Sequence, residues 1–220
     1  MIPTFAIERT QELLYEFDAI LEENKIPKVP IFLDSPMAIK ATDVFRHSSQ
    51  YFNDTDKAEA KIDDHFHFPE LKLTQSVFQS KEINKVTGPK VIIAGAGMMN
   101  GGRILHHAKR YLSDPKSMLL IIGYQVVGSM GRRLFDGEKL VKIHGENINV
   151  KANIKAIGAY SAHADQPKLI EFIRAINPKP KKIFITHGEP EQATALAEKI
   201  KQEFGIETFI PKFGESVELL

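Results

Sequence analysis

The sequence contains no cysteine, so disulfide bonds, thiolate metal ligands and a cysteine nucleophile are all excluded. It also has almost no net charge, because 29 Lys and Arg residues are balanced by 28 Asp and Glu residues, which leaves a formal charge of +1 at pH 7. Bulk charge therefore argues neither for nor against a nucleic-acid partner. Any surface that binds phosphate has to be local.

Long apolar runs are missing as well. The longest aliphatic run, Met118 to Ile122, is far too short to cross a bilayer. Met1 is not followed by the basic stretch and apolar core of a signal peptide, and we expect a cytoplasmic protein. The chain shows no internal repeat and no low-complexity segment. With 43% hydrophobic and 26% charged residues, it is typical of a globular protein with one large domain or two small ones.

Short apolar runs alternate with segments of helical period along most of the chain. Strands are expected at residues 2–7, 29–33, 90–94, 118–122, 156–160, 183–186 and 208–210. This alternation predicts an α/β fold with a mostly parallel sheet flanked by helices. Residues 53–64 are polar and rich in both charges, which predicts a solvated helix or loop. Residues 140–152 instead predict a hairpin, and we expect one domain at 1–152 and a second segment at 153–220.

Two histidines, His163 and His187, each follow an apolar run and precede a helix. Asp165 is a good N-cap for the first of these helices, and Pro167 suits its first turn. A strand–helix–strand segment with short joints predicts a βαβ unit, whose parallel strands end at the same edge of the sheet. Ligands bind at that edge in open α/β sheets. The spacing therefore favours a shared site, and the alternative is two strand-end histidines satisfied by hydrogen bonds.

Two histidines do not complete a catalytic zinc site, which typically takes three protein ligands. The nearest carboxylate candidates are Asp34, Asp165 and Glu189. Asp165 is more simply a helix cap, and Glu189 is placed to orient His187 through a hydrogen bond. A Ser/His/Asp triad has little support, because Ser161 lies only two residues before His163 and no nucleophile-elbow turn is present.

The glycine-rich stretch Gly95–Arg103 follows a predicted strand and opens a predicted helix. It is not a dinucleotide fingerprint, because Asn100 stands where the third glycine is required, and no Gly-Lys-Ser/Thr follows to make a P-loop. Free backbone N–H groups at a helix start, beside Arg103, nevertheless suit a phosphate. The alternative is a tight strand-to-helix turn, and both interpretations stay open.

The remaining histidines give weaker indications of a metal site. His65 and His67 form a His-x-His pair after two aspartates, but no further ligand follows at a useful spacing, so a metal site is disfavoured. His106 and His107 are neighbours on a predicted helix and diverge by about 100°, so they cannot chelate one ion together. We expect them to be partly buried or exposed. His144 is predicted to lie in the turn of the hairpin.

Six motifs occur in the order seen in one family of nucleases. They are Ile2–Leu14, Phe32–Ala38, Ala96–Arg103, Gly123–Arg132, Ser161–Asp165 and Thr186–Glu189. In these motifs the chain resembles the β-CASP nucleases of the metallo-β-lactamase superfamily, the RNA-processing group that includes the cleavage and polyadenylation endonuclease and its archaeal and bacterial relatives. The resemblance covers nearly the whole chain.

The resemblance implies a β-CASP domain inserted into a metallo-β-lactamase domain, with RNA bound in the cleft between them. It implies two zinc ions that activate the attacking water or hydroxide. By resemblance, His187 is a zinc ligand that Glu189 supports, and His163 protonates the leaving oxygen. A histidine at position 187 is associated with RNA-directed members of the family. The residues implied to contact phosphate are Ser161, Arg9, Arg103 and Arg132.

The chain departs from the family in one large respect. The main metal motif, His-x-His-x-Asp-His, is absent, since none of the eight histidines begins it. The chain therefore resembles the C-terminal half of such a nuclease, expected to bind zinc weakly or not at all and to be inactive alone. The implied partners are RNA, the missing N-terminal half and a second copy in a homodimer, with no membrane. The alternatives are a stand-alone, non-catalytic RNA- or partner-binding module and a small-molecule hydrolase of the same superfamily.

Overall fold

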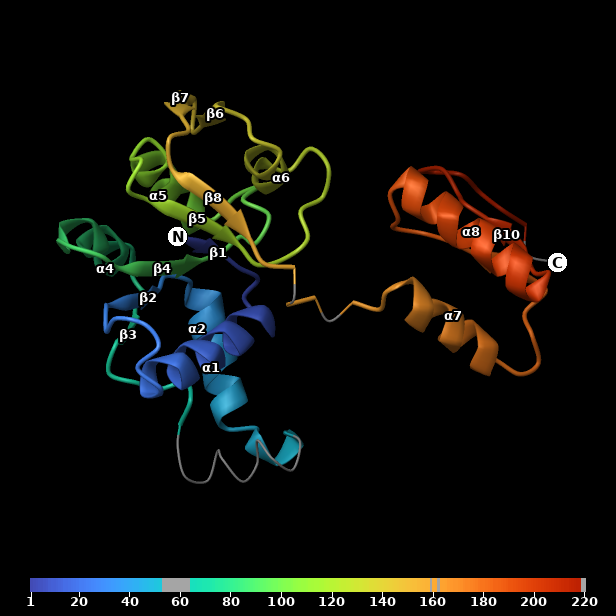
Figure 1. Cartoon of the computed structure of the whole chain (residues 1–220), viewed down its shortest axis with the longest axis horizontal. Coiled ribbons are helices and arrows are strands. Elements are labelled where there is room, and N and C mark those ends of the chain that lie inside the picture. The colour runs from blue at the N-terminus through green and yellow to red at the C-terminus, as the bar shows by residue number, and fades with distance from the viewer. Residues whose placement is uncertain (53–63, 159, 162, 219–220) are drawn as a thin grey trace. The chain divides into compact units, whose positions relative to one another are not determined.

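The structure is a computed structural model, and it describes residues 1–52, 64–158, 160–161 and 163–218. Most of the predicted polar segment at 53–64 lies outside the described residues. The chain forms two compact units, Met1–Ser161 and Ala162–Leu220 (Figure 1). No helix in the described ranges is both long and apolar enough to cross a membrane.

The first unit is built on parallel strands. A four-stranded parallel sheet has the order β1 (Ile2–Pro3), β4 (Val91–Ala94), β2 (Ile31–Leu33) and β3 (Leu71–Leu73). Beyond it, β5 (Met118–Ile121) pairs in parallel with β8 (Asn153–Ala156). Met1 joins the two, because its amino group donates to the carbonyl of Met118 at 2.8 Å and its carbonyl accepts from the N–H of Leu120 at 2.9 Å. Figure 1 shows these strands as one fanned layer.

Helices cover the sheet of the first unit (Figure 1). They are α1 (Arg9–Glu22), α2 (Pro36–Arg46), α4 (Val77–Glu82), α5 (Arg103–Tyr111) and α6 (Met130–Phe135), with short 3₁₀ turns at η1 (Ser49–Tyr51) and η2 (Ile83–Lys85). Ser35 caps α2 by accepting from the N–H of Ala38, and Pro36 opens the helix, as these residue types favour. Helices on a parallel sheet confirm the predicted fold class.

Hydrophobic cores lie on both faces of the layer. Alternate residues of a strand point to opposite faces. On β4, Ile93 packs with α1 and α2, whereas Ala94 packs with α5 and α6. On β5, Leu120 packs in the core that contains α1 and α2, and Leu119 packs in the core that contains α5 and α6. Because both faces are covered, the side-chain positions of the strands are fixed, and polar groups gather where the strands end.

The hairpin predicted at 140–152 is present in a shorter form. The strands β6 (Leu140–Ile143) and β7 (Glu146–Asn149) pair antiparallel. His144 and Gly145 form the two-residue turn with φ angles of 49° and 83°, and positive values at both positions are the signature of a type I′ turn. The predicted turn role of His144 is confirmed.

The second unit contains α7 (Gln166–Ala175), β9 (Lys182–Phe184), α8 (Pro190–Phe204) and β10 (Glu207–Phe209). Asp165 caps α7 as predicted, by accepting from the N–H of Lys168 at 3.0 Å. The strands β9 and β10 pair in parallel and are joined by α8, so they form a βαβ unit. The core of the second unit comes from α7, β9, α8 and the joints next to the strands, and it includes Ile170, Ile173, Ile185, Ala193 and Ile200.

The predicted βαβ unit formed by the strands near residues 156 and 183 stays a prediction, because these strands lie in different units. Within the units, all four residues of β8 pair with β5, and β9 pairs with β10. The apolar side chains of β8 account for its pairing with β5. Ile154 of β8 packs against the same core as Leu119 and Ile121 of β5, which lies in the first unit. The division at residues 152 and 153 stays a prediction.

Candidate functional site

The motif segments of the first unit converge on one edge of its strands. Thr4–Glu8 follows β1, Asp34–Ser35 follows β2, Gly95–Gly102 follows β4, and Gly123–Ser129 follows β5. Because these strands are parallel, their carboxyl ends lie along the same edge, where ligands bind in α/β folds. We call the four segments the carboxyl rim. Residues far apart in the sequence thus share one surface.

The two glycine-rich segments of the rim are hydrogen-bonded to each other. The N–H of Gly131 donates to the carbonyl of Met98 at 3.1 Å, and the N–H of Met130 donates to Asn100 Oδ1 at 3.2 Å. The buried side chain of Gln125 donates through Nε2 to the carbonyl of Gly97 at 3.1 Å. The segment after β4 and the start of α6 therefore form one connected unit.

At Gly102 the rim backbone approaches the backbone of Gly95 closely. Its φ of 76° lies in the region that favours glycine, and a Cβ added there would meet the carbonyl oxygen of Gly95 at 2.3 Å. Ile104 donates its N–H to that same carbonyl at 3.0 Å, which closes the loop onto the start of α5. The close approach is therefore part of the turn itself.

We predict that Gly102→Ala lowers the free energy of unfolding by about 3 kcal/mol or more, because backbone strain and a steric clash add together. Urea unfolding measures this loss. Gly88→Ala is the matched control, since Gly88 has a similar φ of 81° but open space around an added Cβ. Equal losses in the two variants would mean that the approach to Gly95 contributes nothing.

A buried carboxylate lies just behind the rim. Asp34 is fully buried, and its Oδ1 accepts hydrogen bonds from Thr74 Oγ1 at 2.9 Å and Arg103 Nη1 at 2.7 Å. Its Oδ2 accepts from Ser80 Oγ at 2.6 Å and faces His107 Nε2 at 2.7 Å. We call these five residues the Asp34 cluster. It joins the ends of β2 and β3 to α4 and α5.

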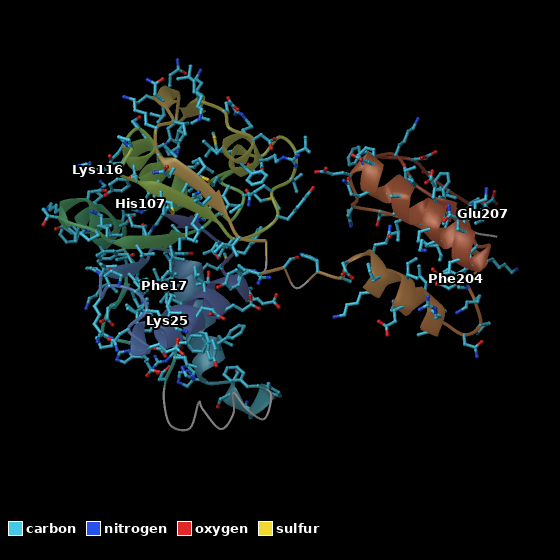
Figure 2. All side chains as sticks on the ribbon, in the orientation of Figure 1. Phe17, Lys25, His107, Lys116, Phe204 and Glu207 are labelled. Carbon is cyan, nitrogen blue, oxygen red and sulfur yellow. The ribbon has the colours of Figure 1, made fainter. Side chains whose placement is uncertain are left out.

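His107 was not expected to be buried. Its exposed fraction is only 1%, and it belongs to the first unit (Figure 2). The sequence did hold a signal for this role, because Arg103 and His107 are four residues apart and so lie on one face of a helix. A carboxylate at the end of a buried strand, such as Asp34, needs partners of that kind.

The cluster sets the pKa of Asp34. Burial on its own raises the pKa of this carboxyl group, but the hydrogen bonds from His107, Ser80, Arg103 and Thr74 outweigh burial and lower the pKa from 3.8 to about 2. The folded protein therefore favours the charged form of Asp34 more strongly than the unfolded chain does.

This shift predicts how stability depends on pH. A carboxyl group whose pKa is lower in the folded state stabilises the protein fully above its unfolded pKa, and that contribution disappears as the pH falls through the folded pKa. The free energy of unfolding should therefore drop between about pH 4 and pH 2. Urea titrations at a series of pH values measure it. Asp34→Asn should show a shallower decline, and an unchanged decline would contradict the assignment.

Three predicted phosphate contacts lie on or beside the rim. Arg9 opens α1, Arg103 opens α5 and Arg132 lies in α6. Each guanidinium already has a carboxylate partner: Glu12 for Arg9, Asp34 for Arg103, and Asp136 for Arg132 at 2.9 Å. The fourth predicted contact, Ser161, is exposed at the end of the first unit. These roles stay predictions.

His163 and His187 both lie in the second unit and are exposed. His187 follows β9 with a φ of 62°, an uncommon backbone conformation for a residue other than glycine, and such outliers cluster at functional sites. Glu189 is half-buried and stands at the N-terminus of α8. The predicted roles of all three residues stay predictions.

Within the described ranges, no three or more His, Asp or Glu side chains converge as metal ligands. The His-x-His pair fits this result, because His65 faces Asp18 at 2.9 Å through Nδ1, while His67 is exposed. Asp63 lies outside the described residues. The donor groups described in this chain therefore do not make a catalytic zinc site by themselves.

Comparison with known proteins gives two matches to family profiles. Residues 10–134 match the Beta-Casp domain, and residues 147–211 match the Zn-dependent metallo-hydrolase RNA specificity domain. Ribonuclease TTHA0252 of Thermus thermophilus is 36% identical over 218 residues, which are 99% of this chain and 49% of that protein.

Two archaeal relatives also match nearly the whole of this chain, which covers only part of each of them. The RNase J-like protein of Methanocaldococcus jannaschii is 34% identical over 217 residues, 97% of this chain and 48% of that protein. Transcription termination factor FttA of Methanothermobacter thermautotrophicus is 32% identical over 232 residues, 100% of this chain and 35% of that protein. The chain thus spans about half or less of the length of these curated relatives.

Proposed function

Because the chain belongs to the β-CASP family of metallo-β-lactamase-fold nucleases, we propose that it is the RNA-specificity part of a zinc-dependent ribonuclease that hydrolyses RNA phosphodiester bonds. The observation that carries this proposal is the match of residues 147–211 to an RNA specificity domain of zinc-dependent metallo-hydrolases. The carboxyl rim supports it, because Arg9, Arg103 and Arg132 lie on or beside it.

Residue roles follow from the motifs. In the proposed enzyme, His187 is a zinc ligand oriented by Glu189, and His163 donates a proton to the leaving oxygen. Ser161, Arg9 and Arg132 are the proposed phosphate contacts, while Arg103, which the same motifs imply, is already paired with Asp34. Residues 1–152 form the proposed β-CASP domain, and residues 153–220 form the proposed segment of the metallo-β-lactamase domain.

The proposal that zinc takes part rests only on membership of the family. The described side chains offer no group of three ligands, so zinc binding would need further ligands from a segment with the His-x-His-x-Asp-His motif. When bound, zinc would supply an activated water or hydroxide. This chain's proposed part is to place RNA and to provide His163 and His187. Alone, it is expected to be inactive.

The proposed setting is the cytoplasm, with RNA and a histidine-rich catalytic segment as partners. A homodimer is also proposed. The second candidate function is a stand-alone RNA- or partner-binding module without catalysis. The lack of a three-ligand group among the described residues favours this alternative when the chain acts alone.

Salt-dependent binding of single-stranded RNA tests the proposed specificity role. We predict that the 220-residue chain binds RNA with a logarithmic salt slope of about −0.7 for each phosphate that it neutralises, and that a chelator leaves binding unchanged. Arg132→Gln should make the slope shallower by about 0.7. Lys25→Gln, which lies in the loop after α1, is the control. An RNA affinity that is undetectable at low salt would contradict the proposal.

A further inference from the structure

The carboxylate of Asp34 has no capacity left for a substrate or a metal ion. It lies at the end of β2, where its backbone N–H donates to the carbonyl of Ile93 at 2.8 Å. Its two oxygens face four side-chain partners, two on each oxygen. An ionised carboxylate offers about four lone-pair positions. Asp34 therefore acts on other residues of the protein.

Arg103 extends the same set of contacts. Besides Asp34, its Nη1 donates to the carbonyl of Thr74 at 3.0 Å, and its Nη2 donates to the carbonyl of Gln75 at 2.8 Å. Both carbonyls belong to the segment that follows β3. Only 20% of the Arg103 side chain is exposed. The planar guanidinium thus ties the first residue of α5 to the ends of β2 and β3, which a lysine cannot do in the same way.

Arg103, which these contacts hold in place, directly follows the glycine-rich loop Gly95–Gly102. Within the loop, the N–H of Ala96 donates to the carbonyl of Gly101 at 3.3 Å, and the N–H of Met99 donates to the carbonyl of Ala96 at 3.0 Å. One turn further along α5, His107 contacts the other oxygen of Asp34. The start of α5 is therefore fixed at two points, and a displacement of Arg103 would be transmitted into Gly95–Gly102.

We infer that Asp34 is a positioning residue: through Arg103 it holds Gly95–Gly102 in shape, and the Arg103 side chain supports this loop instead of binding phosphate. The part that concerns RNA rests on the proposed function of the rim. The part that concerns the shape of the loop does not, because it follows from the contacts of the Asp34 cluster alone.

The two possible roles of Arg103 predict opposite effects of Asp34→Asn. If Arg103 binds phosphate, removing the competing carboxylate frees its charge, and RNA binds more tightly. If Arg103 positions the loop, the same change loosens the loop, and RNA binds more weakly. Arg103→Lys separates the roles as well, because it keeps the charge and removes the planar fork.

The experiment uses the 220-residue chain as wild type, Asp34→Asn, Arg103→Gln, Arg103→Lys and the Asp34/Arg103 double variant. Amide hydrogen exchange is followed at Gly95–Gly102, with the β6–β7 hairpin as the internal reference. Affinity for single-stranded RNA is measured over a range of salt concentrations. Arg132→Gln is the matched control, because its partner Asp136 is exposed and stands directly after α6.

We expect every Asp34 and Arg103 variant to speed exchange in the loop at least tenfold over the hairpin, and the double variant to add nothing to either single change. RNA affinity should fall by the same factor in Asp34→Asn and Arg103→Gln, with the salt slope of Arg103→Gln unchanged. Arg132→Gln should instead reduce the slope.

Unchanged exchange in the loop would overturn the inference, and so would tighter RNA binding by Asp34→Asn. If Asp34→Asn does not fold, loop exchange in Arg103→Lys decides the question. If the wild-type chain does not bind RNA, the proposed function fails, while the exchange data still decide whether the Asp34 cluster holds the loop.

Discussion

His163→Ala should lower kcat for RNA cleavage by about 10²- to 10⁴-fold in a protein that joins this chain to a segment with the His-x-His-x-Asp-His motif, since that is the usual contribution of a general acid. An exposed imidazole before α7 can approach a bound substrate without rearrangement of the core. The loss should fall on kcat more than on KM, because proton donation acts in the transition state.

The pH profile identifies the chemistry of this loss. A general acid gives the rate a limb that declines as the acid deprotonates, and that limb should be missing in His163→Ala. His67→Ala is the matched control, because His67 is also exposed but lies in the first unit. Unchanged kcat in His163→Ala would remove His163 from the catalytic residues.

His187→Ala should have the second large effect, a loss of bound zinc together with cleavage in the same joined protein. Loss of a group that merely orients a ligand costs about 10- to 100-fold in metal affinity, so the loss of a ligand should cost at least as much. Glu189→Gln should give the smaller effect, because Glu189 is proposed to orient His187. Elemental analysis after dialysis measures the zinc content.

The difference in zinc content between His187→Ala and Glu189→Gln is the informative result. Zinc content that is unchanged in His187→Ala would remove His187 from the ligands, whatever happens to cleavage. His67→Ala again serves as the control and should keep full zinc content. An equal loss of zinc in all three variants would indicate damage to the fold instead of the loss of a ligand.

Local features could be predicted from the sequence because they depend on adjacent residues. Ser35 and Asp165 cap helices, and His144 with Gly145 turns the hairpin, as their residue types require. The alternation of strands and helices gave the fold class for the same reason. The partner of β8 could not be predicted, because several short apolar strands fit one another equally well until the packing of the cores selects β5.

The candidate site was predictable only in part. The glycine-rich stretch Gly95–Arg103 marked part of the rim, since glycine permits the backbone geometry that Gly102 adopts. The Asp34 cluster was missed because its contacts join residues as far as 73 positions apart, and the spacing of Arg103 and His107 places them on one helix face without revealing Asp34 as their partner. Arg103 shows the consequence: its position beside glycines suggested a phosphate, whereas its contacts with Asp34, Thr74 and Gln75 emerge only from the fold.

One cleavage assay tests most directly whether this chain is the RNA-specificity part of a zinc-dependent ribonuclease. Labelled single-stranded RNA, and DNA of the same sequence, are incubated with zinc and this chain alone, the His-x-His-x-Asp-His segment alone, or the two joined. The joined protein should cleave RNA, a chelator should abolish that cleavage, and neither part alone should cleave. RNA left intact by the folded, zinc-loaded joined protein would contradict the proposed function, as would cleavage of RNA by this chain alone.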